Sequence, residues 1–388
     1  MKQGSAVHQA LENEVHVTVP VETVSKEDTW GLRIWNICQG LRTLRETGRT
    51  RELEIWGTIG GELVNGIVDE LSYECPDPKY EEKLKTTGQP VSDLPEYQTS
   101  ITEYLLAKPE KDGGPSLKPS QRHNEKWIYI TDVKTRATPT LPTGSSLRPT
   151  VVQLHLYHHM LENLAQGNFS LDRLTERYTL DPESTFSDSF LAQLGNLNHE
   201  VFNDVSSAAE DSPPSSQHSM DILLQHNNLR SLWAYMMEQY RITFLLNDST
   251  YAVPADPPPS SQISTSDLPP PPAQPTRLSS LLTASFMSSK YKHASGAKRI
   301  LGYKSFQFNP AFLHTYLSEA LAWWRGERDA KGVVLQEAWK CRSCDFRHEC
   351  SWIQEREKLA LDQALERKKM RELAGVESDE TGLTRSKV

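Results

Sequence analysis

The stretch that decides the fold reads WIYITDVKTR at residues 127–136, and VVQLHLYHHM follows at residues 151–160 after a turn rich in proline and glycine. The first run is short and apolar and ends in Asp132-Val133-Lys134. It predicts a β-strand over residues 127–134. Because alternate residues of a strand share a face, Asp132 and Lys134 should project together.

The second run predicts an amphipathic helix over Val151–Leu164. Gln153 and Tyr157 are four residues apart in it, and residues at this spacing are neighbours on one helix face. The whole stretch therefore supplies two polar pairs, one on a strand and one on the helix that follows.

A predicted strand upstream also carries an acid. The runs RELEIWGTI and ELVNGIVDELSY, within residues 51–74, are separated by Gly60-Gly61 and predict a β-hairpin. Asp69 lies near the end of the second run. A carboxylate there is equally consistent with a solvated strand end, but Asp69 would lie beside Asp132 if the two strands are neighbours in one sheet.

Asp69, Asp132 and Lys134 are the side-chain types that hydrolysis of a phosphodiester needs. Carboxylates can hold Mg²⁺, a hard cation that prefers oxygen ligands, and the bound ion activates water. A lysine beside the metal can orient or deprotonate that water and stabilise charge on the phosphate. Asp-x-Lys alone occurs by chance in many chains, so its weight here comes from the acid upstream and the Gln-x3-Tyr helix downstream.

The composition limits the class of protein. The 388 residues allow one large or two ordinary domains, while 37% hydrophobic residues and 24 prolines indicate that part of the chain is linker. A formal net charge of -9 argues against a surface that binds nucleic acid everywhere, but it permits a local basic groove. No apolar run of about 18 residues predicts a membrane span.

The N-terminus shows neither a secretory signal nor an arginine-rich transit peptide. Met1 opens almost directly onto a helix-like pattern, GSAVHQALENE at residues 4–14, which contains His8. We therefore expect that sequence upstream of Met1 is missing. In isolation, His8 is explained as a surface or packed histidine.

Three of the five cysteines form a cluster late in the chain. Cys341, Cys344 and Cys350 have the spacing C-x2-C-x5-C, which indicates a metal or iron–sulfur site rather than packing. Zinc held by these thiolates and His348 is one interpretation. A 4Fe-4S cluster is the other, and it normally requires a fourth thiolate.

The order of these motifs resembles the RecB-like branch of the PD-(D/E)XK nuclease superfamily. The residues that match that pattern, in chain order, are His8, Asp69, Asp132, Lys134, Gln153 and Tyr157. The resemblance implies that His8, Asp69, Asp132 and the carbonyl of Val133 bind metal. It also implies that Lys134 acts on the water, and that Gln153 and Tyr157 support the site or the DNA backbone.

Taken over residues 1–166, 229–247 and 298–355, the chain resembles the eukaryotic exonuclease V, or defects-in-morphology, family. That family implies a Mg²⁺-dependent exonuclease specific for single-stranded DNA and directed to 5′ ends. The enzyme is expected to be monomeric and mitochondrial, with the nucleus as a second location. Binding to a membrane is not expected. The sequence does not determine its protein partners.

The family resemblance also implies a 4Fe-4S cluster on Cys341, Cys344 and Cys350. Its fourth cysteine is expected upstream of His8 and is absent from this sequence. Cys38 and Cys75 are substitutes to consider, although neither occupies the family's position. Cys38 is itself predicted to be a core residue of a helix over residues 28–47.

The expected fold is α/β. It has a PD-(D/E)XK core with a mixed sheet, built from the hairpin at 51–71 and the strand at 127–134, and a mainly helical region closed by the cysteine cluster. Along the chain we expect the first part of the core at 1–166, with an insertion at about 75–125. A helical segment should follow at 167–297, with disordered tracts at 204–219 and 254–275. A strand, a helix and the cysteines should occupy 298–355, and a charged helix and tail 356–388.

Two alternatives remain open at this level. One is another type of RecB-like iron–sulfur nuclease, although the sequence lacks the P-loop of a helicase fusion. The other is a non-catalytic iron–sulfur or zinc protein that binds DNA or acts as a scaffold. The complete set of Asp69, Asp132 and Lys134 argues against the second.

Overall fold

The computed structural model describes residues 9, 11–13, 15, 20–87, 126–194, 215–246, 275–292 and 298–382. The chain divides into two compact units, Met1–Leu317 and Ser318–Val388. His8 and the proline-rich residues 254–274 lie outside the described residues.

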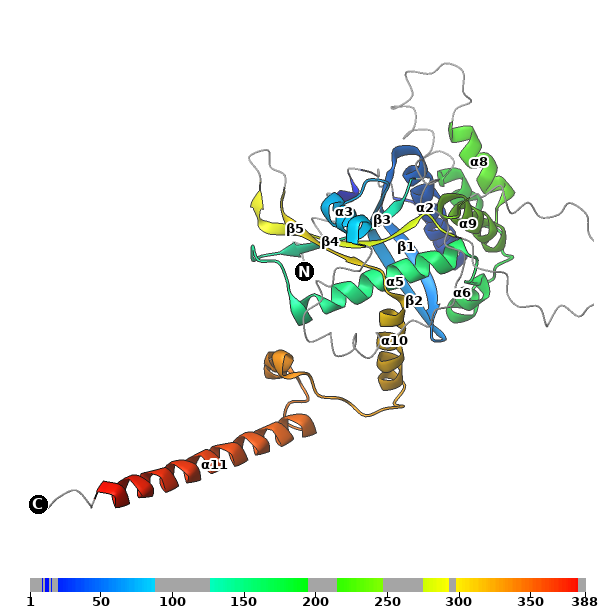
Figure 1. Cartoon of the computed structure of the whole chain (residues 1–388). Coiled ribbons are helices and arrows are strands. Elements are labelled where there is room, and N and C mark those ends of the chain that lie inside the picture. The colour runs from blue at the N-terminus through cyan, green and yellow to red at the C-terminus, as the bar shows by residue number, and fades with distance from the viewer. Residues whose placement is uncertain are drawn as a thin grey trace, which may run out of the picture. The chain divides into compact units, whose positions relative to one another are not determined.

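The first unit holds the sheet and the helices that cover it (Figure 1). Its described elements are α2 (Lys26–Thr47), β1 (Arg49–Ile59), β2 (Glu62–Ser72), α3 (Pro78–Thr87), β3 (Ile128–Arg136), η3 (Gly144–Ser146), α5 (Arg148–Ala165), α6 (Leu171–Tyr178), α8 (Ser215–Gln225), α9 (Leu229–Phe244), β4 (Leu278–Lys292), β5 (Lys298–Gln307) and the start of α10 (Pro310–Trp324). The predicted strand over residues 127–134 and the predicted helix over Val151–Leu164 are confirmed to within a few residues as β3 and α5.

The five strands form one sheet in the order β1-β2-β3-β4-β5. Only β3 and β4 are parallel, and the other neighbours are antiparallel, so the predicted mixed sheet is confirmed. The hairpin β1–β2 turns at Gly60 and Gly61, which both have positive φ angles, as the sequence predicted. Strand β3 lies at the centre of the sheet.

Helix α2 begins and ends at residues that fit its caps. Ser25 and Asp28 form a capping box, and Gly48 ends the helix in the left-handed conformation. The helix packs on β1 and α9, and its Cys38 is buried, as predicted. Arg45 fixes α2 to α9 through hydrogen bonds to the side chains of Gln239 and Thr243.

Helix α5 crosses the sheet and packs on β1, β3 and β4 (Figure 1). Its close approach depends on a glycine. An added Cβ at Gly57 of β1 would lie 2.7 Å from Cγ of Met160. Because this helix also carries Gln153 and Tyr157, its contact with the sheet sets the position of the candidate site.

Strand β4 was not predicted. It lies within residues 167–297, for which the sequence suggested only helices and disordered tracts. Serine and threonine are common in its sequence, LSSLLTASFMSSKYK, and such residues are typical of loops. In the sheet, however, the buried hydroxyls have partners. Oγ1 of Thr283 and Oγ of Ser305, which lies in β5, form a hydrogen bond of 3.1 Å.

Two predicted insertions are more ordered at their edges than expected. Residues 78–87 of the 75–125 insertion form α3, whose Tyr80 packs in a cluster with Tyr129 and Leu281. Residues 215–219 of the tract at 204–219 begin α8 instead of being disordered. Residues 88–125 and 204–214 lie outside the described residues.

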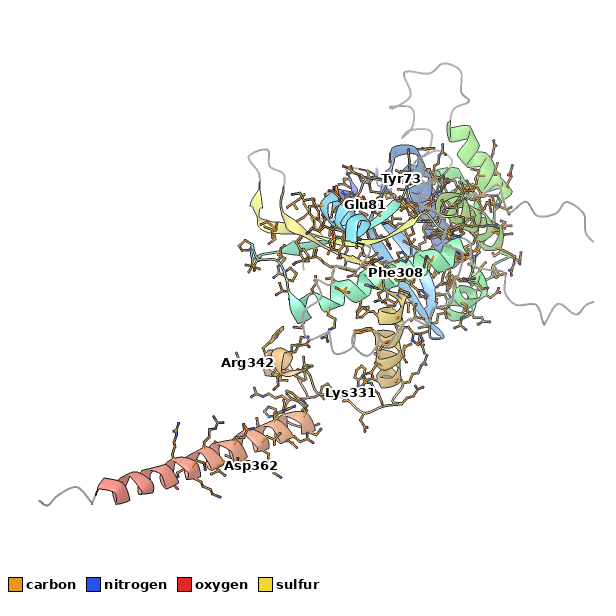
Figure 2. All side chains as sticks on the ribbon, viewed as in Figure 1. Tyr73, Glu81, Phe308, Lys331, Arg342 and Asp362 are labelled. Atoms are coloured by element: carbon orange, nitrogen blue, oxygen red, sulfur yellow. The ribbon has the colours of Figure 1, made fainter. Side chains whose placement is uncertain are left out.

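The second unit contains the end of α10, the 3-10 helix η4 (Leu335–Ser343) and the charged helix α11 (Ser351–Gly382). Within it, Glu319 and Lys331, the latter labelled in Figure 2, form an ion pair at 2.8 Å. Among the residues that the structure describes, none of the helices has the length and hydrophobicity needed to cross a membrane.

A buried histidine joins α5 to the start of α10. His155 donates from Nδ1 to the carbonyl of Val151 at 2.7 Å, and its Nε2 accepts from the backbone N–H of Asn309 at 3.1 Å. Its ring also stacks on Phe306, and Phe308, labelled in Figure 2, lies beside it. These contacts require the neutral ring, and burial lowers the pKa of His155 to about 4.

This pKa makes stability depend on pH. Between pH 6.5 and about 4 the unfolded chain binds a proton at His155 that the folded chain does not, so the free energy of unfolding falls as pH decreases through this range. We expect His155→Phe to reduce the difference in unfolding free energy between pH 7.5 and pH 4.5 by about 2–3 kcal/mol, measured by urea denaturation.

The exposed His314 on α10 provides a matched control. His314→Gln should retain the pH dependence of the parent protein. An equal pH dependence in the parent and in His155→Phe would show that folding does not lower the pKa of His155.

Candidate active site

The two candidate carboxylates meet where β2 and β3 separate. These strands pair only at Glu70↔Thr131, Leu71↔Ile130 and Ser72↔Tyr129, and the next residue on each strand is Asp69 or Asp132. In this fork, Oδ2 of Asp69 accepts a hydrogen bond of 2.6 Å from the backbone N–H of Val133. The prediction that the two acids lie on neighbouring strands is confirmed.

An irregularity in the hairpin helps to direct Asp69 into the fork. The β1–β2 pairing is continuous except at Glu52 and Asp69, and Glu52 has a φ of 52°, in the left-handed region. Thr50 and Leu53, three residues apart, both face Gly40 of α2, so the usual alternation of side chains is interrupted at this point. Such distortions often redirect a side chain at a functional site.

Lys134 connects the strand pair to the helix pair. Its Nζ donates to Oδ1 of Asp132 at 2.9 Å and to Oε1 of Gln153 at 3.0 Å. Gln153 in turn donates from Nε2 to the hydroxyl of Tyr157 at 2.7 Å. Both predicted pairs are therefore confirmed as same-face pairs, and the structure joins them in one hydrogen-bonded chain.

The side chains in this hydrogen-bonded network differ sharply in burial. Asp132 is 0% exposed and Asp69 is 8% exposed, whereas the Lys134 side chain remains 34% exposed. Burial raises the pKa of the Tyr157 hydroxyl, and the carboxylates of Asp132 and Asp69 raise it further. Tyr157 thus remains a neutral phenol at physiological pH, and the site presents an ammonium group towards solvent.

Tyr157 lies directly on strand β2 because residue 66 has no side chain. An added Cβ at Gly66 would lie 2.6 Å from Cε1 of the Tyr157 ring. Sequence reasoning did not assign a role to Gly66. A glycine inside a predicted strand is nonetheless a signal of close approach by another group, and this signal could have identified it.

The donor atoms at the fork fit a hard divalent cation. The carboxylates of Asp69 and Asp132 are both buried at this fork, and a buried negative charge is costly unless a cation or hydrogen-bond donors compensate it. The carboxylates of Asp69 and Asp132 and the carbonyl of Val133 are oxygen ligands of the type Mg²⁺ prefers. The remaining predicted ligand, His8, lies outside the described residues.

The predicted cysteine cluster is not assembled in the second unit. Cys341 is in η4, Cys344 follows it and Cys350 precedes α11, and none of the three forms a disulfide. In the part of the chain that the structure describes, no three His, Cys, Asp or Glu side chains converge as a metal-binding group.

The two cysteines considered as substitutes, Cys38 and Cys75, both lie in the first unit. Burial raises the pKa of the Cys38 thiol far above its usual range, and burial also raises the pKa of Cys75. Cys38 lies inside the packed face of α2.

The fold and the site define an α/β protein with a carboxylate–lysine centre at a fork in a mixed sheet. Comparison with known families then identifies the chain more closely. The profile of the family described as "Exonuclease V - a 5' deoxyribonuclease" matches residues 1–353. The chain belongs to this family of nucleases.

A curated relative agrees with this assignment. The chain is 20% identical to Exonuclease V of Danio rerio over 354 residues, which cover 91% of this chain and 61% of the relative. The chain therefore spans about 61% of the length of the curated relative that it matches.

Proposed function

We propose that this chain is a DNA exonuclease with a PD-(D/E)XK-type core, and that it hydrolyses phosphodiester bonds with the help of Mg²⁺. The observation that carries the proposal is the fork between β2 and β3. It combines Asp69, Asp132 and Lys134, the side chains that this chemistry requires, in one site. Membership of the exonuclease V family supports it independently.

Asp69, Asp132, the Val133 carbonyl and His8 would hold the metal in this proposal. When bound, Mg²⁺ supplies an activated water and neutralises charge on the phosphate. Lys134 orients that water or stabilises the developing phosphate charge, since its ammonium is partly exposed beside Asp132. Gln153 fixes the direction of the Lys134 side chain, and Tyr157 fixes Gln153.

The finer parts of the proposal follow from the family. They are specificity for single strands, digestion from 5′ ends, a monomeric state, a mitochondrial or nuclear location, and a 4Fe-4S cluster on Cys341, Cys344 and Cys350. The description of the family includes the 5′ direction and supports that part.

Metal removal tests the proposed chemistry directly. We expect the protein to degrade 5′-labelled single-stranded DNA in Mg²⁺, to lose this activity completely with EDTA, and to regain it when Mg²⁺ is added in excess. A duplex of the same sequence should be degraded much more slowly. Degradation that is equally fast in EDTA would contradict the role assigned to Asp69 and Asp132.

A further inference from the structure

A pocket adjoins the candidate active site and has no role in the chemistry derived above. This open pocket has a volume of about 360 Å³, within the range of small-ligand sites. Three elements line it: the part of β2 that has no β3 partner, one side of α5, and α10. The lining residues are Val64, Asn65, Gly66, Pro149, Val152, Gln153, Leu156, Tyr157, Met160 and Tyr316.

The chemistry of the lining indicates the class of ligand. None of these ten residues carries a charge, so the pocket is unsuited to a phosphate or a metal ion. Most of its wall is aliphatic, and Tyr316 adds an aromatic ring that is 38% exposed. Asn65 and Gln153 contribute amide groups, which can both donate and accept hydrogen bonds. A flat, neutral group with polar edges fits these walls.

Gln153 ties the pocket to the candidate site. The same side chain lines the pocket and accepts a hydrogen bond from Lys134, whose ammonium contacts Asp132. A group in the pocket is thus separated from the carboxylate–lysine centre by one side chain. In a nucleic-acid strand, the base is the flat neutral group attached next to each phosphate.

We propose that this pocket holds the nucleobase of the nucleotide adjoining the phosphate to be cleaved, with Tyr316 as its stacking surface. The inference rests on the proposed function and adds a binding subsite to it. Stacking on an aromatic ring tolerates every base, because each base has a π-face, so the subsite secures the strand without demanding a sequence. It also requires an unpaired base, which selects single strands over duplex.

The first test combines a variant with a modified substrate. A single abasic residue is placed at successive positions of a 5′-labelled single-stranded oligonucleotide. For the parent protein, we expect one position at which the abasic residue lowers kcat/KM by about 5- to 100-fold. Tyr316→Ala should lower kcat/KM on intact DNA by a similar factor and should show no further loss with the abasic substrate. Tyr316→Phe should behave like the parent, because the ring is retained.

Tyr303 provides a matched control. It is 40% exposed, close to the value for Tyr316. The pairings Val133↔Ser285 and Ser285↔Tyr303 place it on the face of the sheet opposite Asp132. Tyr303→Ala should therefore retain the abasic penalty of the parent. An unchanged penalty in Tyr316→Ala would overturn the inference and leave the nuclease proposal intact.

A binding measurement separates the pocket from catalysis. The same base is replaced by 2-aminopurine, and Ca²⁺ replaces Mg²⁺. Binding to the parent should quench the fluorescence, and Tyr316→Ala should remove most of the quenching. Quenching without any cleavage in Mg²⁺ would support the pocket and contradict the nuclease proposal. Neither quenching nor cleavage would contradict both.

Discussion

Replacing Asp132 with asparagine is expected to lower kcat/KM on single-stranded DNA by about 10²–10³-fold or more. The substitution keeps the size and shape of the side chain but removes a negative charge from a position that is 0% exposed. The metal would lose an anionic ligand, and Lys134 would lose its charged partner. The measurement is degradation of 5′-labelled DNA in Mg²⁺ under steady-state conditions.

Asp77 is the matched control for this change. Its carboxylate accepts from Ser305 and caps α3, on the other face of the sheet. Asn caps a helix about as well as Asp, so Asp77→Asn should fold and retain activity. If Asp132→Asn degraded DNA as fast as the parent, the candidate site would be wrong, whatever the family assignment.

Gly66→Ala is expected to lower kcat by about 10–100-fold although it replaces no ionisable residue. A new Cβ would lie 2.6 Å from the Tyr157 ring, closer than any real contact, so the ring must move. Tyr157 holds Gln153, and Gln153 holds Lys134, so the displacement passes along this chain to the ammonium. The measurement is kcat and KM on the same substrate, and the loss should appear mainly in kcat.

Overpacking also destabilises a protein, by about 1–3 kcal/mol, and this effect must be separated from the effect on the site. Gly31→Ala serves this purpose, because its new Cβ would meet the Phe186 ring at 2.7 Å within the core of the same unit. Both variants should show lower unfolding temperatures, but Gly31→Ala should keep the kcat of the parent. An equal loss of kcat in both would show that Gly66 has only a packing role.

Local patterns predicted much of this protein. Two-residue alternation placed Asp132 and Lys134 on one strand face, and four-residue spacing placed Gln153 and Tyr157 on one helix face. Gly60-Gly61 marked the hairpin, and Gly48 ended α2. These features depend on neighbours within a few residues, where the periodicities of helix and strand apply directly.

Strand β4 shows where local pattern fails. Its serines and threonines suggest a loop, yet it pairs with β3 on one side and β5 on the other. The hydroxyl of Thr283 is satisfied by Ser305, a residue 22 positions away. Only the completed sheet supplies that partner, so no window of sequence could reveal the strand.

The sequence by itself determined which groups the site contains and on which element each one lies. The tertiary structure decided how they meet: that Asp69 enters a fork where β2 leaves β3, that Lys134 bridges Asp132 and Gln153, and that Gly66 lets Tyr157 lie on the sheet. The physical reason is the separation along the sequence of the residues that determine each feature. Side-chain direction within an element follows from backbone periodicity, whereas the end of a strand pairing and the approach of a helix depend on the packing of residues far apart in the chain.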